Sequence, residues 1–347
     1  MKAFVKLRRG VGNVELVEVE DPPYGDEDLL IEVVAAGVCH TDLLMINWGP
    51  TIEKEYKPSL PLTLGHEFSG RILKIGKHVE GFEVGDPVVG NPILTCGQCS
   101  DCLEGNQQGC IRRSVMGLQR NGTFAEKISV PFKTVYKLPR TVDLEVAALC
   151  EPFNTIIRAY EKARPDYGDT ILISGPGPMG ILALLMGEFC GCGKIIVTGL
   201  DIDRERLRMA ESLGAITINL EKEDLKARVR DITGGAGANI AIETSGNSKA
   251  ITQDLELLSR RGKMILVGFS EDPCQFLPIT FLLKETAMTG VRSYNPKTWE
   301  TCINIVSSGK VDLKPVITHK LPLEDVEKGF QLLQRREGLK ILIKPEY

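Results

Sequence analysis

Residues 170–180, Thr-Ile-Leu-Ile-Ser-Gly-Pro-Gly-Pro-Met-Gly, decide the fold of this chain. An apolar, β-rich run ends at Ser174, and the pattern Gly-x-Gly-x-x-Gly follows it and opens an apolar helical stretch. In such a unit the first glycine makes a tight turn, the second lets the backbone approach a pyrophosphate, and the third lets helix and strand pack closely. The helix N-terminus adds free N–H groups for phosphates. The stretch predicts a dinucleotide-binding turn, with a ligand-free turn as the alternative; the predicted contacts are Gly175, Gly177, Pro178, Met179 and Gly180.

The alternation of strands and helices around this turn predicts a parallel sheet. An amphipathic helix is expected at residues 204–213, and further strands are expected at residues 194–198, 239–243 and 263–267. Strands that alternate with helices at this spacing form βαβ units. We therefore expect a doubly wound dinucleotide-binding domain over residues 155–290. Val267, at the end of the last of these strands, is included among its cofactor contacts.

The flanking sequence has a different pattern. Residues 1–154 alternate short β-rich runs with Gly and Pro, which is typical of a barrel or sandwich. Strands are predicted at residues 29–36, 70–75, 87–90, 125–130 and 134–138, and helical periodicity at residues 143–163. The predicted fold class is therefore α/β. A β-rich domain over residues 1–154 is interrupted by the parallel domain and completed by residues 291–347.

Composition excludes several classes of function. The chain has 347 residues, of which 43% are hydrophobic and 25% charged, as in globular proteins. Its net charge of -4 offers no basic stripe, so we expect no nucleic-acid partner. No apolar run approaches the roughly 18 residues of a membrane span, and the first residues lack the apolar segment of a secretion signal. The 10 cysteines are too sparse for a disulfide scaffold, so we expect a cytoplasmic protein with reduced thiols and no membrane contact.

Four cysteines lie close together in a stretch rich in loop-forming residues, with the spacing Cys96-x2-Cys99-x2-Cys102-x7-Cys110. In a reducing compartment such a cluster predicts a closed, tetrahedral structural zinc site. Two disulfides or an iron–sulfur cluster are the alternatives. One common cluster motif has a proline after its last cysteine, and Ile111 stands at that position here.

Three further motifs carry residues that bind metals: Cys39-His-Thr-Asp42, Gly65-His-Glu67 and Cys150-Glu-Pro152. A catalytic zinc keeps three protein ligands and one open position. Cys39, His66 and Glu151 would supply sulfur, nitrogen and oxygen, and the thiolate and carboxylate would neutralise the zinc charge. Spacing alone does not connect these motifs, because an isolated cysteine or histidine is more often a buried structural residue.

The acid that would bind the adenosine ribose should lie about 20 residues beyond the glycine turn, at the end of the second strand. Asp201 at that position would favour NAD. If Gly199 occupies the strand end instead, Arg204 or Arg206 could receive a 2′-phosphate and favour NADP. As a structural alternative, Asp201 or Asp203 would cap the following helix.

Taken together and in this order, the motifs resemble those of the zinc-dependent medium-chain alcohol and polyol dehydrogenases, over nearly the whole chain. The pair Glu151-Pro152 is similar to the sorbitol and threonine dehydrogenase branch. The resemblance implies a GroES-like catalytic domain interrupted by a Rossmann domain. It also implies two zinc ions per chain, one catalytic and one structural, and NAD as the cofactor, with NADP as the alternative.

The resemblance assigns metal ligands. Cys39, His66 and Glu151 match the catalytic zinc ligands, and Cys150 is the alternative third ligand. Glu67 matches a conditional ligand that could swing in during exchange. The structural zinc ligands correspond to Cys96, Cys99, Cys102 and Cys110.

The resemblance also assigns residues around the reaction. Asp42 matches the acid that orients the zinc-bound histidine, and Thr41 matches the hydroxyl that takes the alcohol proton. His40 falls where the family places a side chain that reaches the cofactor pyrophosphate. Arg292 falls where polyol dehydrogenases place an arginine that lines the pocket, and we include it among the cofactor contacts. Many relatives end their proton relay in a histidine, but Leu44 stands at that position here.

These assignments predict oxidation of a small secondary alcohol or polyol to the ketone, with hydride transfer to the nicotinamide. The alternatives are an amino-alcohol dehydrogenase of the threonine type, a zinc-free type of quinone or enone reductase, and a non-enzymatic NAD(P)-binding protein. Relatives are commonly oligomeric, so we expect a homotetramer, with a dimer as the alternative.

Overall fold

The structure, a computed structural model, describes residues 1–345 and divides the chain into two compact units. The first unit contains residues 1–151, residues 295–309 and the chain from Ile317 onward. The second unit contains residues 152–294 and residues 310–316. The expected limits at residues 154 and 291 therefore differ from those of the structure, and the excursion at residues 310–316 was not predicted. The first limit lies in the first turn of a continuous helix, where Pro152 is tolerated and does not end the helix.

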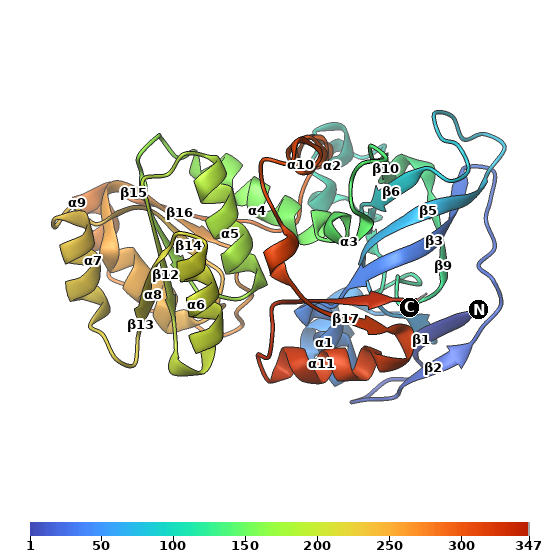
Figure 1. The fold of residues 1–347 in the computed structure, drawn as a ribbon, viewed down its shortest axis with the longest axis horizontal. Coiled ribbons are helices and arrows are strands. Elements are labelled where there is room, and N and C mark those ends of the chain that lie inside the picture. The colour runs from blue at the N-terminus through green and yellow to red at the C-terminus, as the bar shows by residue number, and fades with distance from the viewer. Residues whose placement is uncertain (346–347) are drawn as a thin grey trace. The chain divides into compact units, whose positions relative to one another are not determined.

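The second unit is built on a six-stranded parallel sheet with the order β13-β12-β11-β14-β15-β16 (Figure 1). Its strands are β11 (Thr170–Ser174), β12 (Lys194–Gly199), β13 (Ile216–Asn219), β14 (Ala238–Glu243), β15 (Leu258–Leu266) and β16 (Ala287–Gly290). The order reverses between β11 and β14, which is the point where open α/β sheets bind ligands. The prediction of a doubly wound parallel sheet is confirmed.

Helices cover this sheet because their apolar positions face it. Those that follow the first strand are α5 (Pro178–Phe189), α6 (Arg204–Ser212), α7 (Leu225–Thr233), α8 (Ser248–Leu257) and α9 (Ile279–Lys284). Most of the apolar middle of α5, including Ile181 to Leu184, is buried, and the helix packs against β11 and β12. In α8 the buried positions Ile251, Asp254 and Leu255 face β11, β14 and β15. Side chains of Asp224 and Asn247 cap the first turns of α7 and α8.

The first unit is a mostly antiparallel β structure. Its largest sheet has seven strands, in the order β10-β6-β5-β3-β18-β17, with β9 also paired to β3. These strands are β3 (Asp28–Gly37), β5 (Glu67–Ile75), β6 (Pro87–Gly90), β9 (Lys127–Pro131), β10 (Val135–Lys137), β17 (Ile317–Pro322) and β18 (Lys340–Lys344). Two smaller sheets contain β1 (Lys2–Lys6), β2 (Val14–Glu18) and β4 (Leu62–Thr63), and β7 (Ile93–Leu94) with β8 (Ser114–Val115).

The first unit has short helices beside the residues predicted to bind metal, and longer helices near the end of the chain. They are α1 (His40–Asn47), α2 (Ser100–Leu103), α3 (Leu144–Ala147), α10 (Pro296–Ser308) and α11 (Val326–Gln334). The periodicity predicted over residues 143–163 corresponds to two helices, α3 and α4 (Cys150–Ala163), instead of one. The hairpin of β1 and β2 was not predicted. No helix within residues 1–345 is long and apolar enough to cross a membrane.

Candidate metal centres and dinucleotide site

Strand register brings Cys39 and His66 together. β3 and β5 are antiparallel, and Gly37 at the end of β3 pairs with Glu67 at the start of β5. Cys39 is the N-cap of α1, and His66 directly precedes β5. The ligand atoms of Cys39, His66 and Glu67 all lie within 4.8 Å of one another. A thiolate and an imidazole that converge in this way suit zinc.

Asp42 fixes the orientation of His66. Asp42 Oδ1 lies 3.1 Å from His66 Nδ1, and Asp42 Oδ2 accepts a hydrogen bond of 3.0 Å from the N–H of Cys39. This leaves Nε2 of His66 for a metal, as in carboxylate–histidine–zinc sites. Burial opposes ionisation of His66, but the Asp42 carboxylate and Cys39 outweigh it and raise the pKa of His66 well above its usual value. The surroundings of the imidazole therefore attract positive charge.

Lys340 is a residue of this site that sequence reasoning missed. Its ammonium lies 2.8 Å from both carboxylate oxygens of Glu67 and donates to the carbonyl of Val38 at 3.2 Å. The two side chains are 4% and 1% exposed. Burial disfavours the ammonium, but Glu67 and Cys39 raise the pKa of Lys340. The only sequence signal was a lysine that begins an apolar strand.

The other predicted residues of this centre lie at the starts of helices. Thr41 Oγ1 is 3.7 Å from the thiol of Cys39, and His40 is exposed in the first turn of α1. Glu151 lies in the first turn of α4, and its charge contributes to the raised pKa of Lys340. The converging group contains Glu67 and does not include Glu151. Glu151 as third ligand therefore stays a prediction.

The four cysteines of the loop converge as well. The ligand atoms of Cys96, Cys99, Cys102 and Cys110 lie within 4.8 Å of one another. The Sγ–Sγ distances are 3.4 Å from Cys99 to Cys102 and 3.9 Å from Cys96 to Cys102. A tetrahedral zinc with Zn–S bonds of about 2.3 Å has edges of about 3.8 Å, so the donor set fits this ion.

The electrostatics of the cysteine loop also suit a metal. The N–H groups of Gln98 and Cys99 lower the pKa of the Cys96 thiol to about 6. Thiolate is the form that binds zinc. All ten cysteines are free thiols, so the disulfide alternative finds no support in the structure.

The glycine turn has the geometry of a phosphate cradle. Gly175 has φ of +100°, in the region that favours glycine. A Cβ on Gly180 would collide with the carbonyl oxygen of Gly175, so helix and strand need glycine there. A Cβ on Gly177 would meet no heavy atom within 4 Å. Open space at the N-cap of α5, where Pro178 and Met179 begin the helix, fits a pyrophosphate.

The sequence left Asp201 and Gly199 open as the residue at the strand end. β12 ends at Gly199, and Asp201 lies in the following 3-10 turn, with its carboxylate beside Lys222 Nζ at 2.5 Å and Asn219 Nδ2 at 3.3 Å. Asp201 as a cofactor contact therefore stays a prediction. The hydrogen bond from Lys222 lowers the pKa of Asp201. Arg206 is only 11% exposed and lies 3.8 Å from Asp203.

Two predicted cofactor contacts follow strands of the parallel sheet. Val267 comes directly after β15, and its N–H donates to the carbonyl of Glu243 at 2.9 Å. Arg292 is exposed in the segment after β16.

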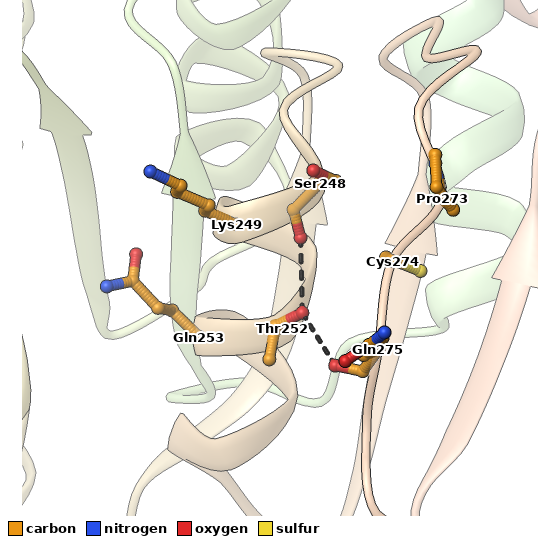
Figure 2. A pocket seen from close by; sticks show the side chains of 7 residues that line it. All are labelled: Ser248, Lys249, Thr252, Gln253, Pro273, Cys274 and Gln275. Carbon is orange, nitrogen blue, oxygen red and sulfur yellow. Dashed lines mark hydrogen bonds between the residues drawn. The ribbon is translucent and has the colours of Figure 1, made fainter.

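Figure 2 shows a shallow pocket on the second unit, outside all of these groups. The exposed face of α8 and the segment Pro273–Gln275 line it, and Thr252 Oγ1 bonds the carbonyl of Gln275 at 3.0 Å. Because none of the predicted site residues lines it, we do not assign the substrate to this pocket.

Two family profiles match the chain. The family described as "Alcohol dehydrogenase GroES-like domain" matches residues 25–140, and the family described as "Zinc-binding dehydrogenase" matches residues 178–308. The sequence is 34% identical to the sorbitol dehydrogenase of Halalkalibacterium halodurans and 34% identical to the L-threonine 3-dehydrogenase of Bacillus velezensis, over 99% of each chain. A solved zinc-binding dehydrogenase from Sinorhizobium meliloti, bound to NADP, is similar in structure, with a TM-score of 0.89, 26% identity and 99% of each chain covered.

Proposed function

The chain belongs to the zinc-dependent medium-chain alcohol and polyol dehydrogenase family, and we propose that it oxidises a small secondary alcohol or polyol to the ketone with a nicotinamide cofactor. The observation that carries this proposal is the convergence of Cys39, His66 and Glu67, with Asp42 behind the histidine. We assign the metal chemistry to the first unit and dinucleotide binding to the second. The names of both relatives fit, because sorbitol and threonine each contain a secondary alcohol.

Each residue of the centre has a defined task in this reaction. Bound zinc supplies Lewis-acid polarisation of the alcohol oxygen, and bound nicotinamide accepts the hydride. Cys39 and His66 would hold the metal, and Asp42 would keep the proton on Nδ1 of His66. The hydroxyl of Thr41 would relay the proton: it would accept the proton of the alcohol oxygen and release its own to water. Lys340 restrains the carboxylate of Glu67 beside the ligands.

The third ligand is tested by a matched pair of neighbours. Glu151→Ala should lower the zinc content of the Cys39 centre while the four-cysteine loop keeps its zinc. Cys150→Ala should retain both ions, because Cys150 is fully buried and both its thiol and its carbonyl interact with Cys302. Loss of one zinc in the Cys150 variant and not in the Glu151 variant would reverse the assignment.

Cofactor preference depends on the residues that follow β12. Because Gly199 ends β12 and Asp201 is engaged by Lys222, the acid offers less discrimination against a 2′-phosphate than the sequence suggested. Steady-state kinetics with both cofactors tests NAD, our first assignment, against NADP. If NADP is preferred tenfold or more, about 1.4 kcal/mol, Lys222→Ala and Arg204→Ala should selectively raise its KM.

A substrate screen distinguishes the alternatives. Purified enzyme is given polyols, simple diols, sugar acids and L-threonine with NAD and NADP, and reduced nicotinamide is followed by absorbance. If L-threonine is the one substrate in this screen that is oxidised, the protein is an amino-alcohol dehydrogenase, the alternative that the Bacillus velezensis relative supports. Reduction of enones by protein without zinc, or dinucleotide binding with no turnover, would overturn the dehydrogenase proposal.

We also propose a cytoplasmic homotetramer, with a dimer as the alternative. Ten free thiols agree with a reducing compartment. The helix α9 and the turn before it expose large apolar side chains next to the edge strand β16, and these are Leu277, Ile279, Leu282 and Leu283. Exposed apolar surface of this kind is typical of protein interfaces. Light scattering after size exclusion tests the number of subunits.

A further inference from the structure

A buried polar cluster lies beneath the glycine turn of the second unit. Ser174 is 3% exposed, and Glu243 and Asp254 are 0% exposed. They come from the end of β11, the end of β14 and the middle of α8. No assignment above uses the acid groups of this cluster, although two buried carboxyl groups without a cation are costly.

Glu243 joins the loops that follow two strands. Its Oε1 accepts hydrogen bonds from the N–H groups of Ser245 at 2.7 Å and Gly246 at 2.9 Å. Its carbonyl oxygen accepts from the N–H groups of Val267 and Gly268, both at 2.9 Å. One residue therefore fixes the backbone beyond β14 and beyond β15, at the edge of the sheet where ligands bind.

The residue after Glu243 extends this network to the glycine turn. The hydroxyl of Thr244 donates to the carbonyl oxygens of Ser174 at 2.8 Å and Gly175 at 3.0 Å. Its N–H also donates to the carbonyl of Ser174 at 3.0 Å. A shift of Glu243 would therefore move the first glycine of the cradle.

Asp254, on α8, contacts the residue that precedes the glycine turn. Ser174 Oγ lies 2.9 Å from Asp254 Oδ1 and 2.7 Å from Oδ2. A hydroxyl carries one hydrogen and can donate to only one of these oxygens. The other short contact is satisfied when the carboxyl group of Asp254 carries its own proton and donates it to Oγ. Among residues 1–345, Oε2 of Glu243 has no hydrogen-bond partner.

Other charged groups on the packed elements do not neutralise Asp254. The ammonium of Lys263, on β15, donates to the carbonyl of Ala163, and that of Lys284, on α9, donates to the carbonyls of Glu256 and Leu258. β14 contributes Glu243, which is negative. Burial, together with the charge of Glu243, raises the pKa of Asp254 to about 8, although the hydrogen bond from Ser174 acts in the opposite direction.

We propose that Glu243 and Asp254 are positioning residues of the dinucleotide site, which binds the cofactor well only while this pair carries a single negative charge. The inference rests on the proposed function, because it concerns the same cofactor. When Asp254 is neutral, Ser174 and Glu243 hold the glycine turn after β11 and the loops after β14 and β15 in place. A second buried carboxylate repels the first and disturbs both anchors of Gly175.

The direction of the pH effect follows from Asp254. Its proton is bound in the folded protein up to a pH of about 8, so cofactor affinity should fall as the pH rises through that value. If the ionised form does not bind, the Kd for NADH or NADPH should rise about tenfold between pH 7 and pH 9. The folded state also loses stability relative to an uncharged variant as the pH rises from the unfolded pKa of about 4 toward 8.

The experiment measures Kd for NADH and NADPH by fluorescence from pH 6.5 to 9.5. Wild type should show the tenfold loss, and Asp254→Asn should change less than twofold over the range. Glu243→Gln leaves Asp254 as the only ionisable group of the pair, so its ionisation adds no second charge and the tenfold loss between pH 7 and pH 9 should be absent. Glu256→Gln, an exposed carboxylate on the same helix, is the matched control and should behave like wild type.

Thermal unfolding supplies a second readout if the variants bind poorly. The Tm advantage of Asp254→Asn over wild type should grow from pH 6 to 8 and then level. A wild type that binds NADH or NADPH equally at pH 7 and 9, or an Asp254→Asn variant with the wild-type profile, would overturn this inference and leave the proposed function standing. A wild type that binds neither dinucleotide at any pH would overturn both.

Discussion

Replacing Lys340 with methionine should destabilise the first unit strongly. The substitution keeps an unbranched side chain of similar length but removes the ammonium that lies 2.8 Å from both oxygens of Glu67. Because the two side chains are 4% and 1% exposed, water cannot replace the lost charge. Removing one partner of a buried ion pair costs about 3–5 kcal/mol. We expect Lys340→Met to lose unfolding free energy in this range, measured by urea denaturation with intrinsic fluorescence.

Two further variants separate the buried charge from lost packing. Glu67→Gln with Lys340→Met removes both charges and should recover much of the loss, because neutral replacements of buried pairs are often tolerated. Lys77→Met breaks a pair of the same 2.8 Å length with Asp26 on the surface, where the side chains are 66% and 54% exposed. That change should cost under about 1 kcal/mol. A Lys340→Met loss as small as that of Lys77→Met would refute the reasoning.

Three other perturbations test the metal centres and the turn. Zinc analysis should find two ions per chain. A chelator should remove zinc from the open Cys39 centre before it removes zinc from the closed four-cysteine loop, so activity should be lost while one ion remains bound. Fully active protein with one zinc per chain would contradict this prediction. Asp42→Asn should weaken zinc at the Cys39 centre about 10–100-fold, measured by competition with a chromogenic chelator. Gly180→Ala should lower the free energy of unfolding by about 1–3 kcal/mol, because its Cβ would collide with Gly175. Gly177→Ala should keep the wild-type Tm and weaken only NADH binding, because its Cβ would meet no protein atom. Equal losses of Tm in the two variants would contradict the proposal that the glycine turn binds a pyrophosphate.

The fold was predictable where its signals were local. β11 and the glycine turn were found because burial, turn chemistry and helix start lie within residues 170–180. The limit after Glu151 was not predictable, because α4 continues across it: Pro152 lies in the first turn of the helix, where proline does not interrupt it. The choice between Asp201 and Gly199 as the strand-end residue stayed open because counting along the chain cannot tell that β12 ends at Gly199 and that a 3-10 turn follows.

The site was predictable where its residues form motifs. Cys39 and His66 stand in recognisable motifs, and the family resemblance joined them. Lys340 was missed because its partner lies 273 residues away and only strand pairing brings them together. Asp254 was missed because an acid in an amphipathic helix is usually exposed, and its burial depends on which face of α8 meets the sheet.

The pairing of β18 with β3 has a consequence for biosynthesis. Leu342 and Ile343 lie opposite Gly37 and Ala36, so the central strand of the first unit is completed by residues that leave the ribosome late. At about 5–20 residues per second, the 273 residues between Glu67 and Lys340 correspond to a delay on the order of 14–55 s. During that time the end of β3 at Ala36 and Gly37 lacks its partner strand, and Glu67 lacks its counter-charge. The second unit has its whole sheet within residues 170–290, so we expect it to fold first and the nascent first unit to need chaperone protection.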